Sequence, residues 1–396
     1  MWSPPPWPGA AADEFPGAAG PRDPGRPEVA AYGDDMSTQP GMVDWDLAVA
    51  TATRLLSAGP EVSRSEADAA VESLRRQVGV AASHVERITA MRSDRPLPPT
   101  RVVDRPGWVR TNADGMATLL TPLVSRLAER RPRPAGRISQ AVGPRATGLQ
   151  AGAVLAFLSG KVLGQFEFFA ETGGQLLLVA PNVVEAERSL GVDPADFRLW
   201  VCLHEVTHRL QFTAVPWLRG HLTGEIDALV AATDLDPDAL RERIAAASQQ
   251  LGRMVRGDRG GDGQGLLGLV QSPAQREVID RLTAFMSLVE GHAEYVMNAV
   301  GPDVVPSIAT IRDRFGQRRQ GAGPVDRFLR KLLGLDVKIR QYADGSRFVG
   351  AVVEAVGIDD FNAVWTSAGT LPRRSELAAP LDWVQRVHGV RPAASA

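Results

Sequence analysis

One pentad in this sequence combines residue types at a spacing that can bind a metal ion and hydrolyse a polar bond: His204-Glu205-Val206-Thr207-His208. On an α-helix its two histidines are one turn apart on the same face, so both imidazoles can reach one ion. Glu205 lies one position round the helix, where its carboxylate can take a proton from a water that zinc has made acidic. The pattern therefore predicts a mononuclear Zn²⁺ site with His204 and His208 as ligands and Glu205 as general base.

The pentad also lies in a sequence that favours the helix it needs. Residues 196–212 contain neither proline nor glycine and are rich in apolar side chains, and Asp193-Pro194 is a suitable start for a helix. Random placement of residues of this composition would produce such a pentad only about 0.004 times in the whole chain. The motif is therefore a specific signal for a metal site.

A third protein ligand is needed, and the sequence offers two carboxylate candidates. The metzincin extension would require glycine at position 211 and histidine at position 214, but the chain has Gln211 and Ala214, so that class is excluded. Glu290 is the favoured ligand, which makes the site gluzincin-like, and the nearer pair Glu225 and Asp227 is the alternative.

Glu290 is favoured because it lies in an apolar stretch of a long helix expected between Ser272-Pro273 and Gly301. A buried glutamate is costly unless it is paired or binds a metal. We expect Gly291 to let the pentad helix approach closely and Glu294 to accept the Nδ1–H of a ligand histidine. His292 points off the face of Glu290, so it is expected to be a packing or supporting residue and not a ligand.

Three further side chains could donate a hydrogen bond to the oxyanion that forms during hydrolysis. His221 follows the pentad helix, and Tyr295 and Tyr342 lie further along the chain. No spacing rule supports any of them, so a packing role remains the alternative for each.

Composition excludes several classes of function. The chain has 396 residues, is 44% apolar and carries a net charge of only −2, so nothing in its charge points to nucleic acid. It has no run of 18 apolar residues, which predicts that no segment spans a membrane. Its single cysteine, Cys202, excludes an intramolecular disulfide and a cysteine-based zinc site. A cytoplasmic location is therefore expected.

The chain divides by composition into four segments. Residues 1–41 are rich in proline and glycine and are expected to be disordered. A helical region at 42–135, a zincin-like metal-binding core at 136–325 and a helical region at 326–396 that completes the core are expected to follow. A strand predicted at 175–180 is either the sheet edge that pairs with an extended substrate or an ordinary core strand. The predicted fold class is α+β, predominantly helical, with a small sheet and an HExxH helix.

Several motifs together make the sequence similar to a known family. Residues 204–212 (HEVTHRLQF), 290–295 (EGHAEY), 43–46 (VDWD) and 335–342 (LDVKIRQY) resemble the bacterial zincin-like metallopeptidase family. Its members are described as hydrolases, in some genomes as associated with deazaflavin coenzyme biosynthesis. The similarity covers about residues 42–390, and Arg209, unusual among zincins in general, fits the family. The resemblance implies a zincin core with His204, His208 and a downstream glutamate as ligands and Glu205 as base.

The function predicted from the sequence is that of a zinc-dependent hydrolase, specifically a metallopeptidase that acts on a peptide or protein substrate. Neither nucleic acid nor membrane is an expected partner, and the identity of the substrate and the oligomeric state are left open. One alternative is a non-catalytic zinc-binding scaffold protein, although the presence of Glu205 argues against it. The other is a zinc amide hydrolase linked to deazaflavin coenzyme metabolism.

Overall fold

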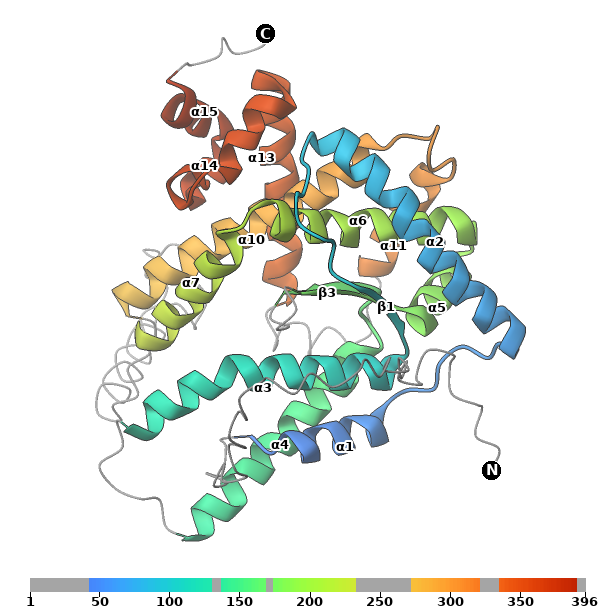
Figure 1. Cartoon of the computed structure of the whole chain (residues 1–396), viewed down its shortest axis with the longest axis vertical. Helices are drawn as coiled ribbons and strands as arrows, with labels where there is room; N and C mark the ends of the chain where they lie inside the picture. Colours follow the sequence, from blue (N-terminus) through green and yellow to red (C-terminus); the bar gives the residue numbers. More distant parts are fainter. Residues whose placement is uncertain (1–42, 130–136, 169–173, 233–271, 321–334, 390–396) are drawn as a thin grey trace, which may run out of the picture. The chain divides into compact units, whose positions relative to one another are not determined.

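The computed structural model describes residues 43–129, 137–168, 174–232, 272–320 and 335–389, which are mostly helical with one small sheet (Figure 1). The predominantly helical α+β class expected from the sequence is confirmed. The expected tail at 1–41 lies outside the described residues. No helix in the described part is long and apolar enough to cross a lipid bilayer.

The chain forms two compact units that are each discontinuous in sequence. Unit 1 consists of residues up to 75 together with 100–189, and unit 2 consists of 76–99 together with 190–396. The composition of the sequence predicts consecutive segments instead, and the boundaries at 135 and 325 stay a prediction.

Unit 1 holds the sheet and the helices around it. In chain order its elements are α1 (Trp45–Leu55), the first part of α2 (Arg64–Thr89), β1 (Thr100–Val103), α3 (Arg105–Glu129), α4 (Arg137–Ser159), β2 (Gly164–Glu167), β3 (Gln175–Val179) and α5 (Ala180–Leu190). Its core gathers apolar side chains from α1, α3, α4, β1 and β3: Ala52, Val103, Trp108, Val109, Ala113, Leu155, Leu177 and Val179.

The sheet has the strand order β1-β3-β2, with β1 parallel and β2 antiparallel to β3. Leu177 of β3 pairs with Arg101 on one side and with Gln165 on the other. The backbone groups of β3 are therefore engaged along both edges. The strand predicted at 175–180 exists, but the idea that it is an edge open to substrate is wrong, and the alternative of a core strand holds.

Helices α1 and α4 pack closely because α4 presents glycine at the contact. A Cβ atom at Gly148 would lie 2.5 Å from the Asp44 carbonyl oxygen, and one at Gly152 would lie 2.5 Å from the Ala48 carbonyl oxygen. Asp44 also caps α1 by accepting a hydrogen bond from the Leu47 amide at 2.9 Å. The sequence around residues 148–152 thus determines how near the two helices lie.

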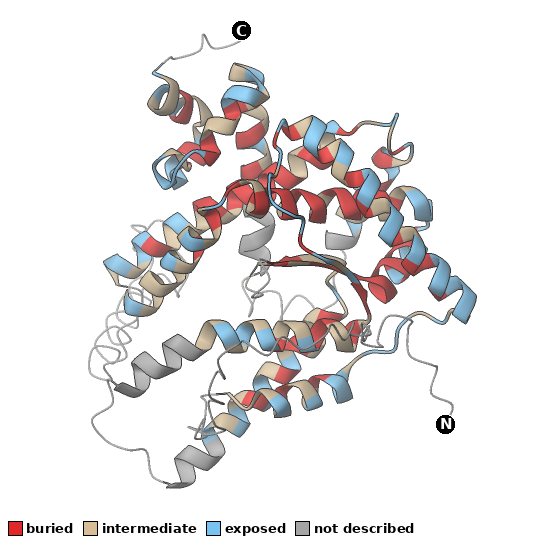
Figure 2. Cartoon of the chain, viewed as in Figure 1, coloured by how far each residue is buried: buried red, intermediate tan, exposed pale blue. Residues whose placement is uncertain are grey.

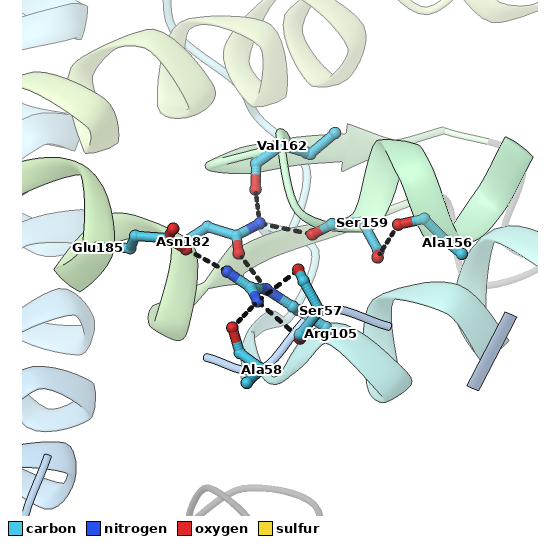
Figure 3. Close-up of polar contacts among 8 residues, drawn as sticks. All are labelled: Ser57, Ala58, Arg105, Ala156, Ser159, Val162, Asn182 and Glu185. Carbon is cyan, nitrogen blue, oxygen red and sulfur yellow. Dashed lines mark hydrogen bonds and ion pairs between the residues drawn. The ribbon is translucent and has the colours of Figure 1, made fainter. Parts of the chain in front are cut away.

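A buried arginine at the start of α3 ties several loops of unit 1 together (Figure 3). The side chain of Arg105 is 4% exposed and pairs with Glu185. It also donates to Asn182 Oδ1 at 2.7 Å and to the carbonyl oxygens of Ser57 and Ala58 at 2.9 and 2.8 Å. Asn182 in turn donates from Nδ2 to the carbonyls that close α4 and the following turn. Each of the three guanidinium nitrogens donates to a protein acceptor, which indicates a structural role.

We predict that Arg105→Met lowers the free energy of unfolding by about 3 kcal/mol, because it removes the donor of the buried Asn182 side chain and of the part-buried Ser57 and Ala58 carbonyls. Urea unfolding followed by circular dichroism measures this change. Arg64→Met is the matched control: its ion pair with Asp68 is exposed, so its effect should stay within about 0.5 kcal/mol. Equal effects of the two substitutions would contradict a structural role for the cluster.

Unit 2 is helical throughout its described residues. It contains the rest of α2, then α6 (Pro194–Ala214), α7 (Leu218–Ala232), α10 (Pro273–Ala299), α11 (Ile308–Gln320), α13 (Leu335–Phe361), the 3-10 turns η1 (Asn362–Trp365) and η2 (Ala368–Thr370), α14 (Arg374–Ala378) and α15 (Pro380–His388). Helix α10 packs against α6, α7 and α13. The backbone of α13 leaves helical geometry at Gly357, whose φ is +84°.

Helix α6 is buried along most of its length in unit 2, as the red ribbon in Figure 2 shows. It begins at Pro194, and Asp193 accepts hydrogen bonds from the amides of Ala195 and Asp196 at 2.9 and 3.0 Å. Its apolar side chains, among them Phe197 at 0% exposure, face the core in several directions. The expected helix and its start are thus confirmed.

Helices α10 and α13 cross with backbone against backbone. A Cβ atom at Gly291 would lie 2.1 Å from the Gly345 carbonyl carbon, and one at Gly345 would lie 1.9 Å from the Ser287 carbonyl oxygen. Gly291 was expected to make room for the pentad helix, and this expectation is wrong. The glycine accommodates α13 instead, because it follows Glu290 by one position and so points about 100° away from it.

Gly291→Ala should lower the free energy of unfolding by about 3 kcal/mol or more, because the added methyl group overlaps backbone that cannot move aside cheaply. Gly350→Ala on α13 is the control, since a Cβ atom there meets no heavy atom within 4 Å. It should raise stability by up to about 1 kcal/mol through its better helix propensity. A tolerated Gly291→Ala substitution, measured by chemical unfolding, would rule out the close crossing.

Candidate metal centre

Three side chains from α6 and α10 bring their donor atoms together in unit 2. His204 Nε2 and His208 Nε2 lie 3.1 Å apart. Glu290 Oε2 lies 3.3 Å from His208 Nε2 and 3.6 Å from His204 Nε2. Among the described residues, these three form the group of side chains that could hold a metal ion. The structure therefore places the favoured carboxylate, 82 positions beyond His208 in the chain, beside both histidines.

The spacing of these donors fits a tetrahedral zinc ion. Ligands about 2.0–2.1 Å from zinc at tetrahedral angles are separated from one another by about 3.3 Å, and the three observed separations bracket this value. Both Nδ1 atoms have partners elsewhere, so both Nε2 lone pairs face the same point. Two lone pairs and a carboxylate directed at one point require a cation between them, either a proton or a metal ion.

The residues that contact the Nδ1 atoms of His204 and His208 differ from the one expected. His204 Nδ1 lies 3.2 Å from Met297 Sδ, and His208 Nδ1 lies 3.0 Å from Gln211 Oε1. Glu294 was predicted to accept an Nδ1–H, but Met297 and Gln211 occupy these positions. The prediction failed because the helix periodicity of α10 does not show which residue meets a histidine on another helix. Gln211 follows His208 by three positions, one helical turn, and that spacing was a signal that could have identified it.

Among the described residues His292 packs beside the donor group without belonging to it, as the sequence predicted. It is fully buried, and its Nδ1 lies 3.0 Å from Gln211 Nε2. Its ring packs against Phe361 and Trp365, with ring centroids 5.5 and 5.4 Å away. Burial, together with the nearby His208, lowers the pKa of His292 to about 3, so this ring is neutral at physiological pH.

The electrostatics of the site favour a cation at its centre. Burial by itself lowers the pKa of His208, but Glu290 outweighs that effect, and Glu205 and Gln211 act in the same direction, so the pKa rises to about 8. Glu205 is 6% exposed on the same helix. Burial, and then the charge of Glu205, raises the pKa of Cys202, so this thiol stays protonated and is a core residue.

The other candidate residues are engaged elsewhere or lie outside the described part. Glu225 accepts two hydrogen bonds from Arg281 Nε at 2.9 and 3.0 Å, and it is not in the donor group of the described residues. His221 packs edge-to-face between Trp217 and Phe285. An oxyanion role for His221 or for Tyr295 stays a prediction, and the side chain of Tyr342 lies outside the described residues.

A pentad helix with two histidines and a second helix with a glutamate define a zincin type of site. The sequence matches the model of the zincin-like metallopeptidase family over residues 43–384, and the chain belongs to this family. The resemblance proposed from the sequence motifs is therefore confirmed. No curated protein matches the sequence.

A solved structure supports the same relationship. The chain is similar to a protein from Chloroflexus aurantiacus whose crystal structure is provisionally called that of a hydrolase with a novel fold. The two share 30% sequence identity and a TM-score of 0.63. The alignment covers 87% of this chain and 99% of the other, so the likeness extends over nearly the whole relative.

The raised pKa of His208 makes the affinity for Zn²⁺ dependent on pH. Below about pH 8 the metal-free protein holds a proton on His208, and a metal ion must displace it. The apparent affinity should therefore rise by up to about tenfold per pH unit below pH 8 and level off above it. Competition with a chelator of known pH dependence measures this, and calorimetry in two buffers counts the released protons. A constant affinity from pH 6 to 9 would contradict the assignment.

Proposed function

We propose that this protein is a zinc-dependent hydrolase, and more specifically a metallopeptidase in which His204, His208 and Glu290 hold Zn²⁺. The observation that carries the proposal is the convergence of three donors at separations of 3.1–3.6 Å on two helices. Membership of the zincin-like metallopeptidase family supports the same activity. The solved relative provisionally called a hydrolase is consistent with it.

The donor set favours a catalytic site over a structural one. Structural zinc sites have four protein ligands, whereas catalytic sites keep a position for water. Among the described residues the donor group has three members. The side chains of His204, His208 and Glu290 are 21%, 12% and 10% exposed, so the centre lies near solvent on the side of His204.

The proposed chemistry divides the work between the ion and the chain. A zinc ion held by His204, His208 and Glu290 would supply a Lewis acid and would lower the pKa of a water bound to it towards 7. Glu205, on the pentad helix and nearly buried, takes the proton from the attacking water as it adds to the peptide carbonyl. The same carboxylate then delivers that proton to the nitrogen of the leaving amine. A peptide or protein substrate and a cytoplasmic location remain predictions.

The test is the substitution Glu205→Gln, which removes the base and keeps the size of the side chain. The variant should keep one equivalent of zinc by elemental analysis and lose at least about 100-fold in turnover. Digestion of a peptide library by the zinc-loaded wild type, analysed by mass spectrometry, supplies the substrate. Glu225→Gln is the control, because Glu225 pairs with Arg281 and should be dispensable for turnover.

Two outcomes would overturn the proposal. Full turnover in Glu205→Gln would exclude this residue as the base. A wild-type protein that binds zinc but cleaves neither peptides nor other amides would favour the non-catalytic zinc scaffold.

A further inference from the structure

A chain of hydrogen bonds runs from His208 into the core of unit 2, away from the metal centre. His208 Nδ1 lies 3.0 Å from Gln211 Oε1. Gln211 Nε2 donates to the Val289 carbonyl oxygen at 2.9 Å and lies 3.0 Å from His292 Nδ1. Gln211 and His292 are both 0% exposed. The NH₂ end of the carboxamide is therefore held by groups that water does not reach, and its other end by the part-buried His208.

One backbone carbonyl determines where the protons of this chain lie. The Val289 oxygen can only accept, so the end of Gln211 that faces it must be the NH₂ group. The other end is then the carboxamide oxygen, which can only accept, so His208 Nδ1 must carry a hydrogen. In the neutral ring the lone pair of His208 is consequently on Nε2, the atom that faces His204 and Glu290.

The second amide hydrogen of Gln211 reaches His292. Since this hydrogen is donated to His292 Nδ1, the proton of the neutral His292 ring is on Nε2. The ring cannot rotate freely, because it is packed against Phe361 and Trp365. His292 thus holds the amide of Gln211 in one orientation, and the amide holds His208.

We propose that Gln211 and His292 are positioning residues that keep His208 in the tautomer and orientation required for binding zinc, an inference that rests on the proposed zinc site. Through this arrangement, helix α10 controls two of the proposed zinc ligands, Glu290 and His208. Helix α10 supplies Glu290 directly, and through the Val289 carbonyl and His292 it also sets the direction of the lone pair of His208. Partners of this kind typically change metal affinity by about 10- to 100-fold when they are removed.

The test compares two substitutions of Gln211 that separate positioning from packing. Gln211→Met keeps the approximate volume of the side chain but cannot accept the Nδ1–H of His208, so zinc affinity should fall by about 10- to 100-fold. Gln211→Glu keeps an oxygen that can accept the Nδ1–H of His208. Its second oxygen replaces the NH₂ group and faces the Val289 carbonyl oxygen, so two acceptors are brought together. It should retain the zinc affinity of the wild type and yet be less stable to urea in the metal-free state than Gln211→Met.

Zinc affinity is measured by chelator competition, with zinc as the only added ligand, and the unfolding midpoint is measured on the metal-free protein. Opposite rankings of the two variants in these measurements support positioning. If zinc affinity instead follows stability, with Gln211→Met at least equal to Gln211→Glu, Gln211 only packs and the proposal is wrong. Thr213→Val is the control, because this buried threonine hydrogen-bonds within α6 and should leave zinc affinity unchanged.

His292→Phe provides a second route if a Gln211 variant does not fold. It keeps an aromatic ring between Phe361 and Trp365 but removes the acceptor for Gln211, so zinc affinity should fall by less than in Gln211→Met. An unchanged affinity in a folded His292→Phe protein would remove His292 from the proposal. If the wild type itself binds no zinc, the proposed function fails. If the wild type binds zinc and all Gln211 variants bind it equally, only the positioning role fails.

Discussion

The arrangement of unit 2 depends on one electrostatic constraint: a nearly buried glutamate faces two imidazole nitrogens across a few ångströms. Glu290 lies 3.3 and 3.6 Å from the Nε2 atoms of His208 and His204. A carboxylate is costly to bury unless a cation accompanies it. In the metal-free protein a proton on His208 meets this need, and its raised pKa is the result. A divalent metal ion would meet the same need of the Glu290 carboxylate for a nearby positive charge.

Helix α10 can place Glu290 beside the histidines because its different faces contact different neighbouring groups. Glu290 is directed at the pentad helix, while Gly291, one residue later, allows α13 to cross in backbone contact. The carbonyl of Val289 and the ring of His292 hold the amide of Gln211. Successive residues on a helix point about 100° apart, so four consecutive positions can serve two neighbouring helices, α6 and α13. A shift of α10 by one residue would disturb the ligand, the crossing and the hydrogen-bond chain together.

The two units treat buried charge in different ways. In unit 1, Arg105 is surrounded by protein acceptors from the loop after α1 and from Asn182 and Glu185 of α5 (Figure 3). Every contact of this guanidinium is internal, so the cluster stabilises the fold and needs no ligand. In unit 2, the Oε2 atom of Glu290 and the Nε2 atoms of the two histidines lie as far apart as the ligand atoms around one metal ion. Both Arg105 and Glu290 are buried, and the chemistry of their neighbours separates the structural charge from the one proposed to bind a metal ion.

The sequence by itself determined the local features of the site, because they depend on short-range spacing. The pentad, the Asp193-Pro194 and Ser272-Pro273 helix starts and the apolar setting of Glu290 could all be predicted, since helix geometry relates residues three or four apart. It also supplied the motifs by which the family was recognised. Only the tertiary structure decided which groups meet across helices. It placed Met297 and Gln211, not Glu294, beside His204 and His208, it placed Gly291 against α13, and it placed β3 in the middle of the sheet. Those contacts depend on how each helix or strand is rotated about its axis relative to its neighbours. The periodicity of a single helix or strand does not determine that rotation.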